Sequence, residues 1–489
     1  MKKLLSTILF LYTAATAAAA DLPQVKITAD STLSARQKVT GHMTTDGYDG
    51  PIGIKLRGNS SLSFNQKKYT IELRDEAGND TEASLAGMPP HADWVLLAPY
   101  NDVSMVRDPL AFHLWRDMGH WGPRTQMVEL TVNGDYRGIY ILAEAIKRGT
   151  ERVDIAKLKK SDTEGRDVTG GYLLRIDTYN DDDATFPSKV PGIGHGIMTS
   201  QITWSCIYPK KRKLQPQQMA YIEQYIDSVE LTIQSPHFAD PARGYARWID
   251  VPSFVDYFIH TELSLNADGY KRSAYFYKEK QRADGSGGKL VAGPVWDYNL
   301  AYGNCNFCNA DKIDAWCFEG GNTQPTPALW QRLLQDPAFR RAVKVRYEAL
   351  RRGVLSDDAI MGYIDRHARL VAPAVARHFL TFPELLVTEP PMGGAFGPMG
   401  GAFGPMGGAF GPMGGGDMIG WFAAYRVTSY DEEIATLKQW LRDRLKFLDK
   451  EIARFDADFE PHIQEPKEIK MPAFGGFPFN FQFPPMNRQ

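Results

Sequence analysis

Apolar residues recur with two different periods along most of the chain. From residue 21 to about residue 389, short apolar runs rich in β-branched residues stand between longer segments with apolar positions at helical spacing. A period of two is typical of strands, and apolar residues at three- and four-residue steps are typical of amphipathic helices. The pattern therefore predicts one continuous stretch of mixed helices and strands over residues 21–389.

A strand, a small polar turn and a second strand are predicted over residues 52–73. Residues 52–57 alternate as a strand, and Gly58-Asn59-Ser60-Ser61 follows as a turn. The second strand, residues 67–73, opens with two lysines. Such a turn offers backbone N–H groups and hydroxyls, and a lysine adds a positive charge, which together can bind a phosphate group.

A helix followed by a hairpin is predicted next. Asp108-Pro109 is a typical helix start, and Gly119 is a typical stop. Two alternating segments, residues 128–132 and 136–142, are separated by Asn133-Gly134, a pair that strongly favours a tight hairpin turn.

Two aspartates follow predicted elements in the segment 252–299. A helical pattern from Pro252 to about Leu265 leads to Asp268, and a hairpin over residues 273–295 leads to Asp297. We expect the helix and the hairpin to bring the two carboxylates to one edge of the fold. Phosphoryl transfer uses such a pair, with one carboxylate near the acceptor hydroxyl and the other on Mg²⁺.

The character of the chain changes over residues 390–417. The seven residues Gly-Gly-Ala-Phe-Gly-Pro-Met occur three times in succession, starting at Gly393. Repeats this rich in glycine and proline hold neither a helix nor a strand ladder, so we expect a mobile insertion.

A last helix is predicted after the repeat, within residues 418–460. Ser429 and Glu432 have the spacing of a capping box. Apolar residues then recur at steps of three and four, namely Ile434, Leu437, Leu441, Leu445, Leu448, Ile452 and Phe455. We expect this stripe to pack on the main domain and residues 461–489, rich in Phe and Pro, to form a disordered tail.

Composition and the N-terminus narrow the class of protein. The 56 basic and 58 acidic side chains leave a net charge of −2, which argues against a global nucleic-acid footprint. Residues 1–20 have two lysines, an apolar run and a string of alanines, which is the pattern of a secretory signal peptide. The mature protein is therefore expected to be secreted, or periplasmic or in the cell envelope, with no stable membrane span.

Four cysteines suit neither a disulfide scaffold nor an evident zinc site. Cys305 and Cys308 have CxxC spacing and Cys317 is near, but Cys206 is far away in the sequence, whereas structural zinc takes four ligands. In an exported protein we expect a disulfide instead, without being able to assign its partners.

Several segments, in the same order, resemble the CotH kinase family of atypical protein kinases over about residues 22–455. The segments that carry the resemblance are Arg57-Gly58-Asn59-Ser60-Ser61, Lys67-Lys68-Tyr69, Asp93-Trp94-Val95-Leu96-Leu97, Val106-Arg107-Asp108, Val132-Asn133-Gly134-Asp135-Tyr136-Arg137-Gly138 with Glu144, and Val295-Trp296-Asp297-Tyr298-Asn299. The resemblance implies an α+β, protein-kinase-like fold with a β-rich N-terminal lobe and a mostly helical C-terminal lobe. It also implies that ATP and Mg²⁺ or Mn²⁺ bind and that Ser or Thr of exported proteins is phosphorylated.

The resemblance also suggests roles for individual residues. Asp268 resembles the catalytic aspartate, Asp297 the metal-binding aspartate, and Lys67, or its neighbour Lys68, the lysine that grips the phosphates. Lys67 is preferred because strand alternation places it on the face of Tyr69 and Ile71. The remaining expected site residues are Arg57, Gly58, Asn59, Ser60, Ser61 and Glu144 for ATP, with Glu144 near the interlobe hinge, and Asn299 and Ser273 for the metal.

Two other functions remain open at this point. Ser273 stands where a typical kinase has a metal-binding Asn, which leaves room for a non-catalytic binding or adhesion protein of the cell envelope on a kinase-like scaffold. A glycoside hydrolase that uses Asp268 with Asp297 or Glu262 is the third hypothesis, although it gives the lysine strand and the turn at Gly58 no role.

Overall fold

The computed structural model describes residues 21–179, 183–193, 201–320, 325–387, 423–456 and 459. The predicted signal peptide (1–20), repeat insertion (390–417) and tail (461–489) lie outside the described residues. Among the helices described, none is long and apolar enough to cross a membrane.

The described residues form a mixed α+β fold, as the sequence predicted. The strands are β1 (Gln24–Ala29), β2 (Val39–Thr45), β3 (Tyr48–Arg57), β4 (Lys68–Leu73), β5 (Asp93–Leu97), β6 (Thr125–Val132), β7 (Asp135–Glu144), β8 (Tyr172–Ile176), β9 (Ala184–Pro187), β10 (Thr203–Tyr208), β11 (Ala274–Lys278) and β12 (Leu290–Ala292). The helices are α1 (Arg107–Asp117), α2 (Pro216–Gln234), α3 (Val251–Ser264), α4 (Leu329–Leu334), α5 (Pro337–Arg351), α6 (Asp357–Thr381) and α8 (Tyr430–Ile452).

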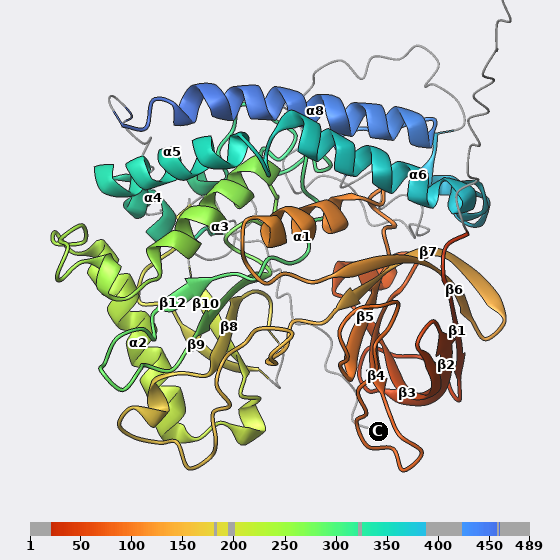
Figure 1. Ribbon diagram of the computed structural model, residues 1–489, viewed down its shortest axis with the longest axis horizontal. Helices are drawn as coiled ribbons and strands as arrows, with labels where there is room; N and C mark the ends of the chain where they lie inside the picture. Colours follow the sequence, from red (N-terminus) through yellow and green to blue (C-terminus); the bar gives the residue numbers. More distant parts are fainter. Residues whose placement is uncertain are drawn as a thin grey trace, which may run out of the picture.

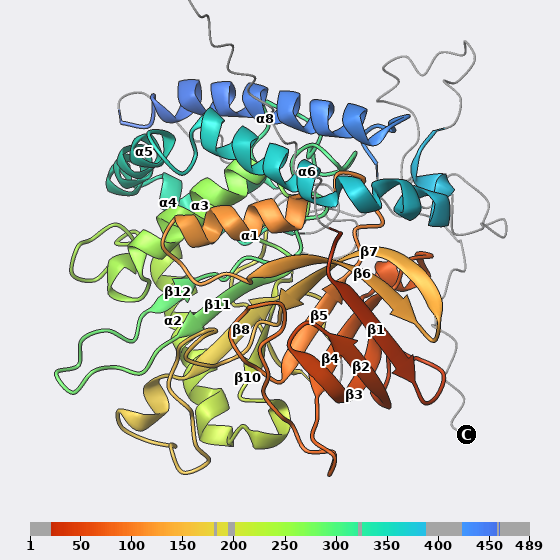
Figure 2. The same ribbon diagram turned by 45° about the vertical axis from the view of Figure 1, so that its right-hand side comes forward.

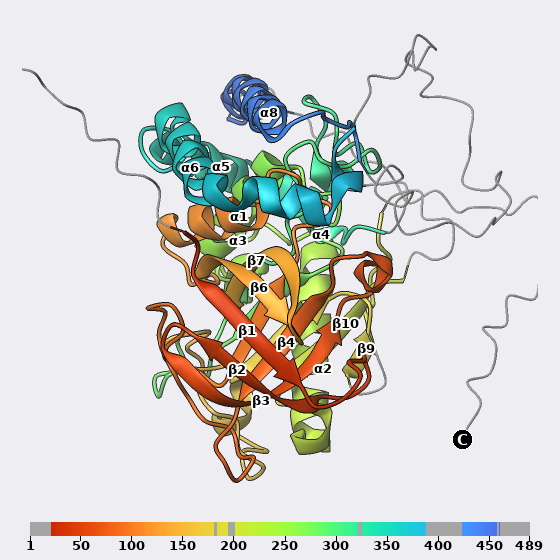
Figure 3. The same cartoon turned by 90° about the vertical axis from the view of Figure 1, so that its right-hand side faces the viewer.

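The first seven strands close into a barrel in the order β1-β2-β3-β4-β5-β7-β6 (Figure 3). Neighbouring strands are antiparallel except at the closure, where β1 pairs in parallel with β6. Alternate side chains fill the interior, including Ile54, Tyr69, Ile71, Trp94 and Tyr140. Burial of this apolar surface is the main stabilising contribution to the barrel.

Strands β5 and β7 have apolar side chains on both faces. In β5, Trp94 and Leu96 point into the barrel, whereas Val95 and Leu97 pack outward against a second core that includes α1 and α3. This explains why Asp93–Leu97 contains four consecutive apolar residues rather than an alternating pattern. The barrel and the helical part are therefore held together through shared strands.

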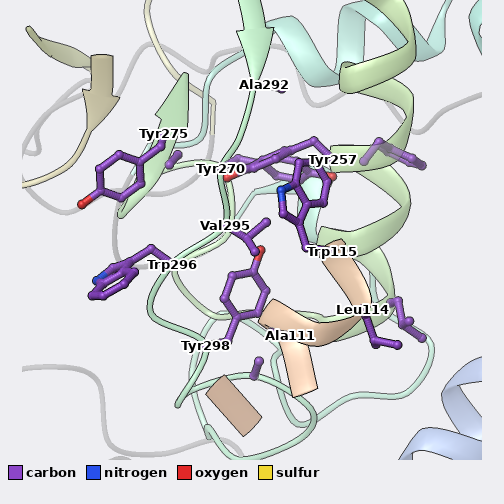
Figure 4. Packing of buried hydrophobic residues seen from close by; sticks show 14 of the residues in the cluster. Ala111, Leu114, Trp115, Tyr257, Tyr270, Tyr275, Ala292, Val295, Trp296 and Tyr298 are labelled. Carbon is purple, nitrogen blue, oxygen red and sulfur yellow. The ribbon is translucent and has the colours of Figure 1, made fainter. Parts of the chain in front are cut away.

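The second sheet lies beside the barrel and has the order β12-β11-β8-β10-β9 (Figures 1 and 2). A layer that contains α1, α3, α5, α6 and α8 covers one side of the molecule, and α2 lies apart from it next to the second sheet (Figure 1). Aromatic residues of α1, α3, the loop after α3 and the segment after β12 form the centre of the larger core, among them Trp115, Tyr257, Tyr270 and Tyr298 (Figure 4).

Local turn and capping signals were confirmed. Asn133 and Gly134 have φ values of 53° and 86°, as a tight hairpin turn requires, and join β6 to β7. Helix α1 ends before Gly119, whose φ is 102°. The hydroxyl of Ser429 accepts a hydrogen bond from the backbone N–H of Glu432, so α8 begins where the capping box predicted.

The buried guanidinium of Arg107 joins α8 to α1. It lies 2.6 Å from a carboxylate oxygen of Asp102 and 2.6 Å from one of Glu433 on α8. It also donates to the hydroxyl of Tyr425 and to the carbonyl of Ala301. Burial lowers the pKa of Arg107, but Tyr425, Glu433 and Asp102 outweigh this effect and raise it well above its ordinary value, so the charge stays in the core.

Arg107→Ala should lower the free energy of unfolding by about 3–5 kcal/mol, because it leaves Asp102 and Glu433 buried without their cation. Chemical denaturation monitored by tryptophan fluorescence measures the change. The control is Arg454→Ala, because Arg454 is largely exposed and its ion pair with Glu451 should contribute less than about 1 kcal/mol. Equal effects of the two substitutions would contradict the role given to the buried network.

Candidate functional site

A polar pocket of about 410 Å³ lies where the barrel meets the second sheet. The barrel contributes the end of β3, the turn after it and the start of β4. The other wall comes from the residues that follow β8, α3 and β12. The volume lies in the range of small-molecule and cofactor sites.

The turn predicted to bind phosphate lines this pocket. Arg57, Gly58, Asn59, Ser60 and Ser61 all belong to its wall. Gly58 has a φ of 122°, and a Cβ there would lie 2.0 Å from the hydroxyl of Ser61, so only glycine fits. The amide of Asn59 donates to the hydroxyl of Thr178 at 2.6 Å, which ties the turn to the opposite wall.

The guanidinium of Arg57 lies over the ring of Trp296, 5.0 Å from its centroid. Trp296 also lines the pocket and packs parallel to Phe112 of α1 at 5.6 Å. This cation–π contact fixes the end of β3 against the segment that carries Asp297.

The structure places Lys68, not the preferred Lys67, in the pocket. The ammonium of Lys68 lies 3.6 Å from a carboxylate oxygen of Asp297, whereas the ammonium of Lys67 donates to the backbone carbonyl of Leu62 at 2.7 Å. The prediction correctly grouped Tyr69 with Ile71, but that face of the strand fills the barrel. The outer face faces the pocket, and Lys68 lies there opposite Arg57 of β3.

Asp268 lies in the pocket on the loop after α3. Burial and the negative charges of Asp297 and Asp177 raise the pKa of its carboxyl group to about 6, against the lowering effect of Arg272 and Lys271. A carboxylate with such a pKa accepts a proton near neutral pH more readily than an ordinary aspartate.

Asp297 lies across from the turn, and its backbone has a left-handed φ of 66°. The carbonyl of Asp297 accepts a hydrogen bond from the side-chain amide of Asn266 at 3.2 Å. The next backbone N–H, that of Tyr298, donates to the carboxylate of Asp108 at 2.6 Å. Thus Asp297 and Asp268, which are 29 positions apart, reach the same pocket.

Asn299 and Ser273, which were expected to bind the metal, also line the pocket. The amide of Asn299 donates to the side chain of Asn101 at 2.8 Å, which leaves its oxygen as the possible ligand. Ser273 has a φ of 46°, and its hydroxyl lies 3.5 Å from a carboxylate oxygen of Asp177.

Sequence reasoning missed Asp177 as a pocket residue. It follows β8 directly, and the pairing of β8 with β11 brings it beside Ser273. Burial and the charge of Asp297 raise its pKa, against the lowering effect of Arg175. The sequence does show that Asp177 directly follows the apolar run of β8, which could have marked it as a candidate. Only the pairing of β8 with β11, however, places it in the pocket.

Two predicted carboxylates lie elsewhere. Glu144, expected to bind the cofactor, is fully buried at the end of β7 and pairs with Arg124 and Arg152, at 2.9 Å and 2.5 Å. Glu262, the alternative glycosidase acid, is fully buried in α3 and accepts hydrogen bonds from the backbone N–H groups of Cys317 and Phe318. Neither is among the described residues that line the pocket.

The expected disulfide is not formed. All four cysteines lie within the described residues, and none of them is joined to another by a disulfide. The thiol of Cys317 donates weakly to the carbonyls of Asn266 and Gly269, on either side of Asp268. It thus packs under the loop of Asp268 without a covalent link.

The donors in the pocket suit a hard cation such as Mg²⁺. They are the oxygens of Asp177, Asp268, Asp297, Asn299 and Ser273. Within the described ranges no three Asp, Glu, His or Cys side chains form a ready-made metal cage. Mg²⁺ is usually held by one or two carboxylates together with waters and substrate phosphates.

Asp268→Asn should stabilise the fold at pH 7.5 by on the order of 2 kcal/mol, because it removes a charge whose pKa the fold raises. The protonated carboxyl favours the folded state below the unfolded pKa near 4, and this contribution is lost as the pH rises through about 6. The stability difference between variant and wild type, measured by urea denaturation, should therefore shrink as the pH falls from 7.5 to 4. The control is Asp30→Asn at the exposed end of β1, and a variant no more stable than wild type at pH 7.5 would contradict the expectation.

The comparisons with known proteins identify the family of the chain. The family model described as CotH kinase protein matches residues 54–448, which include every residue placed in the pocket except Ala35. The chain is 23% identical over 293 residues to the inner spore coat protein H of Bacillus subtilis (strain 168), which covers 60% of this chain and 69% of that protein. Because the family model matches most of the length of this chain, the chain belongs to the CotH kinase protein family.

Proposed function

We propose that the protein is an atypical protein kinase that transfers the terminal phosphate of ATP to Ser or Thr side chains of exported or cell-envelope proteins. The observation that carries the proposal is the convergence of Lys68, Asp268 and Asp297 on one pocket with the turn Gly58–Ser61. One cation, two carboxylates and a glycine-containing turn are what positioning and charge neutralisation of a triphosphate require.

In this proposal the barrel corresponds to the N-terminal lobe of a protein kinase and the helical part to the C-terminal lobe. The pocket then lies between the lobes, as a nucleotide site would. The shared core of β5 and β7 supports a close junction, because both parts pack on the same strands.

Each pocket residue has a task in the proposed reaction. Lys68 neutralises phosphate charge, and the N–H groups and hydroxyls of the turn bind phosphate oxygens. Asp268 takes the proton of the acceptor hydroxyl as its oxygen bonds to the terminal phosphorus and the bond to ADP breaks. Asp297, with Asn299 and Ser273, would hold Mg²⁺ or Mn²⁺, which neutralises charge on the phosphates when bound.

The pair Lys68–Asp297 is loose enough to be rearranged by a ligand. The 3.6 Å separation exceeds that of a short charge-assisted hydrogen bond. A metal ion at Asp297 and a phosphate at Lys68 would replace this single contact with two stronger ones. Lys68 is almost entirely buried, so the ammonium is directed at the pocket rather than at bulk water.

An exported location is part of the proposal. The predicted signal peptide supports it, and the relative in Bacillus subtilis is named as a spore coat protein. Substrates in the cell envelope or outside the cell follow from that location.

A non-catalytic binding or adhesion protein is the second candidate. Ser273 favours it, because a hydroxyl is a weaker Mg²⁺ ligand than the carboxamide usually found in kinases. Asp177, 3.5 Å from Ser273, offers another oxygen and partly offsets this difference.

Lys68→Ala should abolish the rise in melting temperature that ATP with Mg²⁺ causes in the wild type, whereas Lys67→Ala should retain it. The two lysines are adjacent, and only Lys68 lines the pocket, so the pair is a matched test. Differential scanning fluorimetry measures the shift. The nucleotide site would be refuted by a wild type that shows no shift with either Mg²⁺ or Mn²⁺, or by equal losses in both variants.

Asp268→Asn should reduce phosphate transfer from labelled ATP to a generic protein acceptor by at least about 100-fold, because proton transfer typically contributes 10²–10⁴-fold. The melting-temperature shift with ATP and Mg²⁺ should remain. A wild type that binds ATP but transfers nothing to any acceptor would favour the binding protein instead.

A further inference from the structure

The peptide group between Asp297 and Tyr298 is held by side chains on both of its edges. Its carbonyl accepts from the amide of Asn266 at 3.2 Å, and its N–H donates to a carboxylate oxygen of Asp108 at 2.6 Å. Asn266 and Asp108 are 3% and 4% exposed, so neither hydrogen bond competes strongly with water.

This peptide group needs such support because Asp297 has a left-handed backbone conformation. A φ of 66° costs a non-glycine residue on the order of 1 kcal/mol. On the C-terminal side, the ring of Tyr298 is buried in the core beside α1 and α3 (Figure 4). The left-handed residue thus turns the chain so that Tyr298 enters the core while Asp297 faces the pocket.

Asn266 links this peptide group to the loop of the other aspartate. Its side-chain oxygen accepts from the backbone N–H of Asp268 at 3.2 Å, while its amide donates to Asp297. One carboxamide therefore bridges the backbones that carry the two pocket carboxylates, and it is the right group because it both donates and accepts.

Asp108 is itself fixed in the first turn of α1. Its neighbour Arg107 donates to the carbonyl of Ala301, four residues beyond Asp297, and is anchored by Asp102 and Glu433. The start of α1 thus contacts the segment 297–301 at two backbone positions. Asp108 does not line the pocket, but it holds the backbone that carries Asp297, and its carboxyl group also interacts electrostatically with Asp297 and Lys68.

We propose that Asp108 and Asn266 are positioning residues that clamp the Asp297–Tyr298 peptide and so set the placement of Asp297 relative to Asp268. The proposal rests on the proposed function, because it takes Asp297 as the metal-binding carboxylate. It assigns a task to Asp108, which contacts neither pocket nor solvent, and to Asn266, which precedes the expected catalytic residue.

The test measures Mn²⁺ binding to the full chain in the presence of a non-hydrolysable ATP analogue. The electron paramagnetic resonance signal of free Mn²⁺ reports how much of the ion remains unbound. Asp108→Ala and Asn266→Ala should each weaken Mn²⁺ binding about 10–100-fold, the usual effect of removing a group that orients a metal ligand. Asp108→Asn should bind within about 3-fold of wild type, because its oxygen can still accept from the N–H of Tyr298.

Asn266→Asp tests whether Asn266 acts by bridging the backbones of Asp268 and Asp297 through hydrogen bonds or only by filling the space between them. It keeps the acceptor for the N–H of Asp268 but places a carboxylate oxygen against the carbonyl of Asp297. It should therefore weaken Mn²⁺ binding as much as Asn266→Ala does.

The matched control is Asp336→Ala. Asp336 is buried, accepts from the backbone N–H of Ala338 and from the hydroxyl of Tyr245, and caps α5 away from the pocket. This variant should lose stability yet bind Mn²⁺ within about 2-fold of wild type at temperatures well below its melting transition.

Hydrogen–deuterium exchange of the peptide that contains Tyr298 supplies a readout independent of metal and nucleotide. Exchange should be faster in Asp108→Ala and Asn266→Ala and unchanged in Asp108→Asn and Asp336→Ala. A wild type that binds no Mn²⁺ but shows this exchange pattern would refute the metal site and leave the clamp standing. The clamp would be overturned if the wild type binds Mn²⁺ and both Asp108→Ala and Asn266→Ala bind it equally well. It would also be overturned if hydrogen–deuterium exchange in these two variants is the same as in the wild type.

Discussion

The first turn of α1 is the point on which the pocket depends, because it brings a guanidinium and a carboxyl group into the core and uses both to hold another segment. Arg107 is neutralised by Asp102 and Glu433 and donates to Ala301, and Asp108 receives the N–H of Tyr298. Buried charges are costly unless they are paired and hydrogen-bonded, so these contacts define one arrangement of the segment 297–301. The helical layer and the loop beside the pocket thus share one anchor.

The pocket walls balance charge of both signs. Lys68, Arg57 and Lys55 come from the outer face of the barrel, whereas Asp177, Asp268 and Asp297 come from the opposite side, together with Arg175 and Arg272. The carboxylates raise the pKa values of Asp268 and Asp177 by mutual repulsion in addition to burial. A ligand that carries both negative phosphates and a cation would relieve the repulsion on one side and neutralise the cations on the other.

Much of the local structure could be predicted from the sequence, because turns and caps depend on residues close together in the chain. Asn133-Gly134, Gly119 and the Ser429 cap were all confirmed. The turn at Gly58, Asp268 and Asp297 were also brought together as expected, since each follows a recognisable helix or strand.

The errors arose where long-range packing decides the outcome. Both Lys68 and Tyr69 are buried, so alternation could not tell which face of the strand fills the barrel and which faces the pocket. Glu144 was misassigned because Arg124 and Arg152, its partners, are contributed by other segments. Asp177 reaches the pocket only through the pairing of β8 with β11.

Because Glu433 lies on α8, the integrity of the pocket depends on a helix that comes later in the sequence than the described residues that line the pocket. Among the residues that the structure describes, those that line the pocket all precede residue 301, but the cation that anchors the loop beside it is neutralised in part from α8. During synthesis, the ribosome would have to release more than a hundred further residues before this site could mature. A product shortened ahead of α8 would thus retain each chemical group of the pocket and lack the scaffold that orders them.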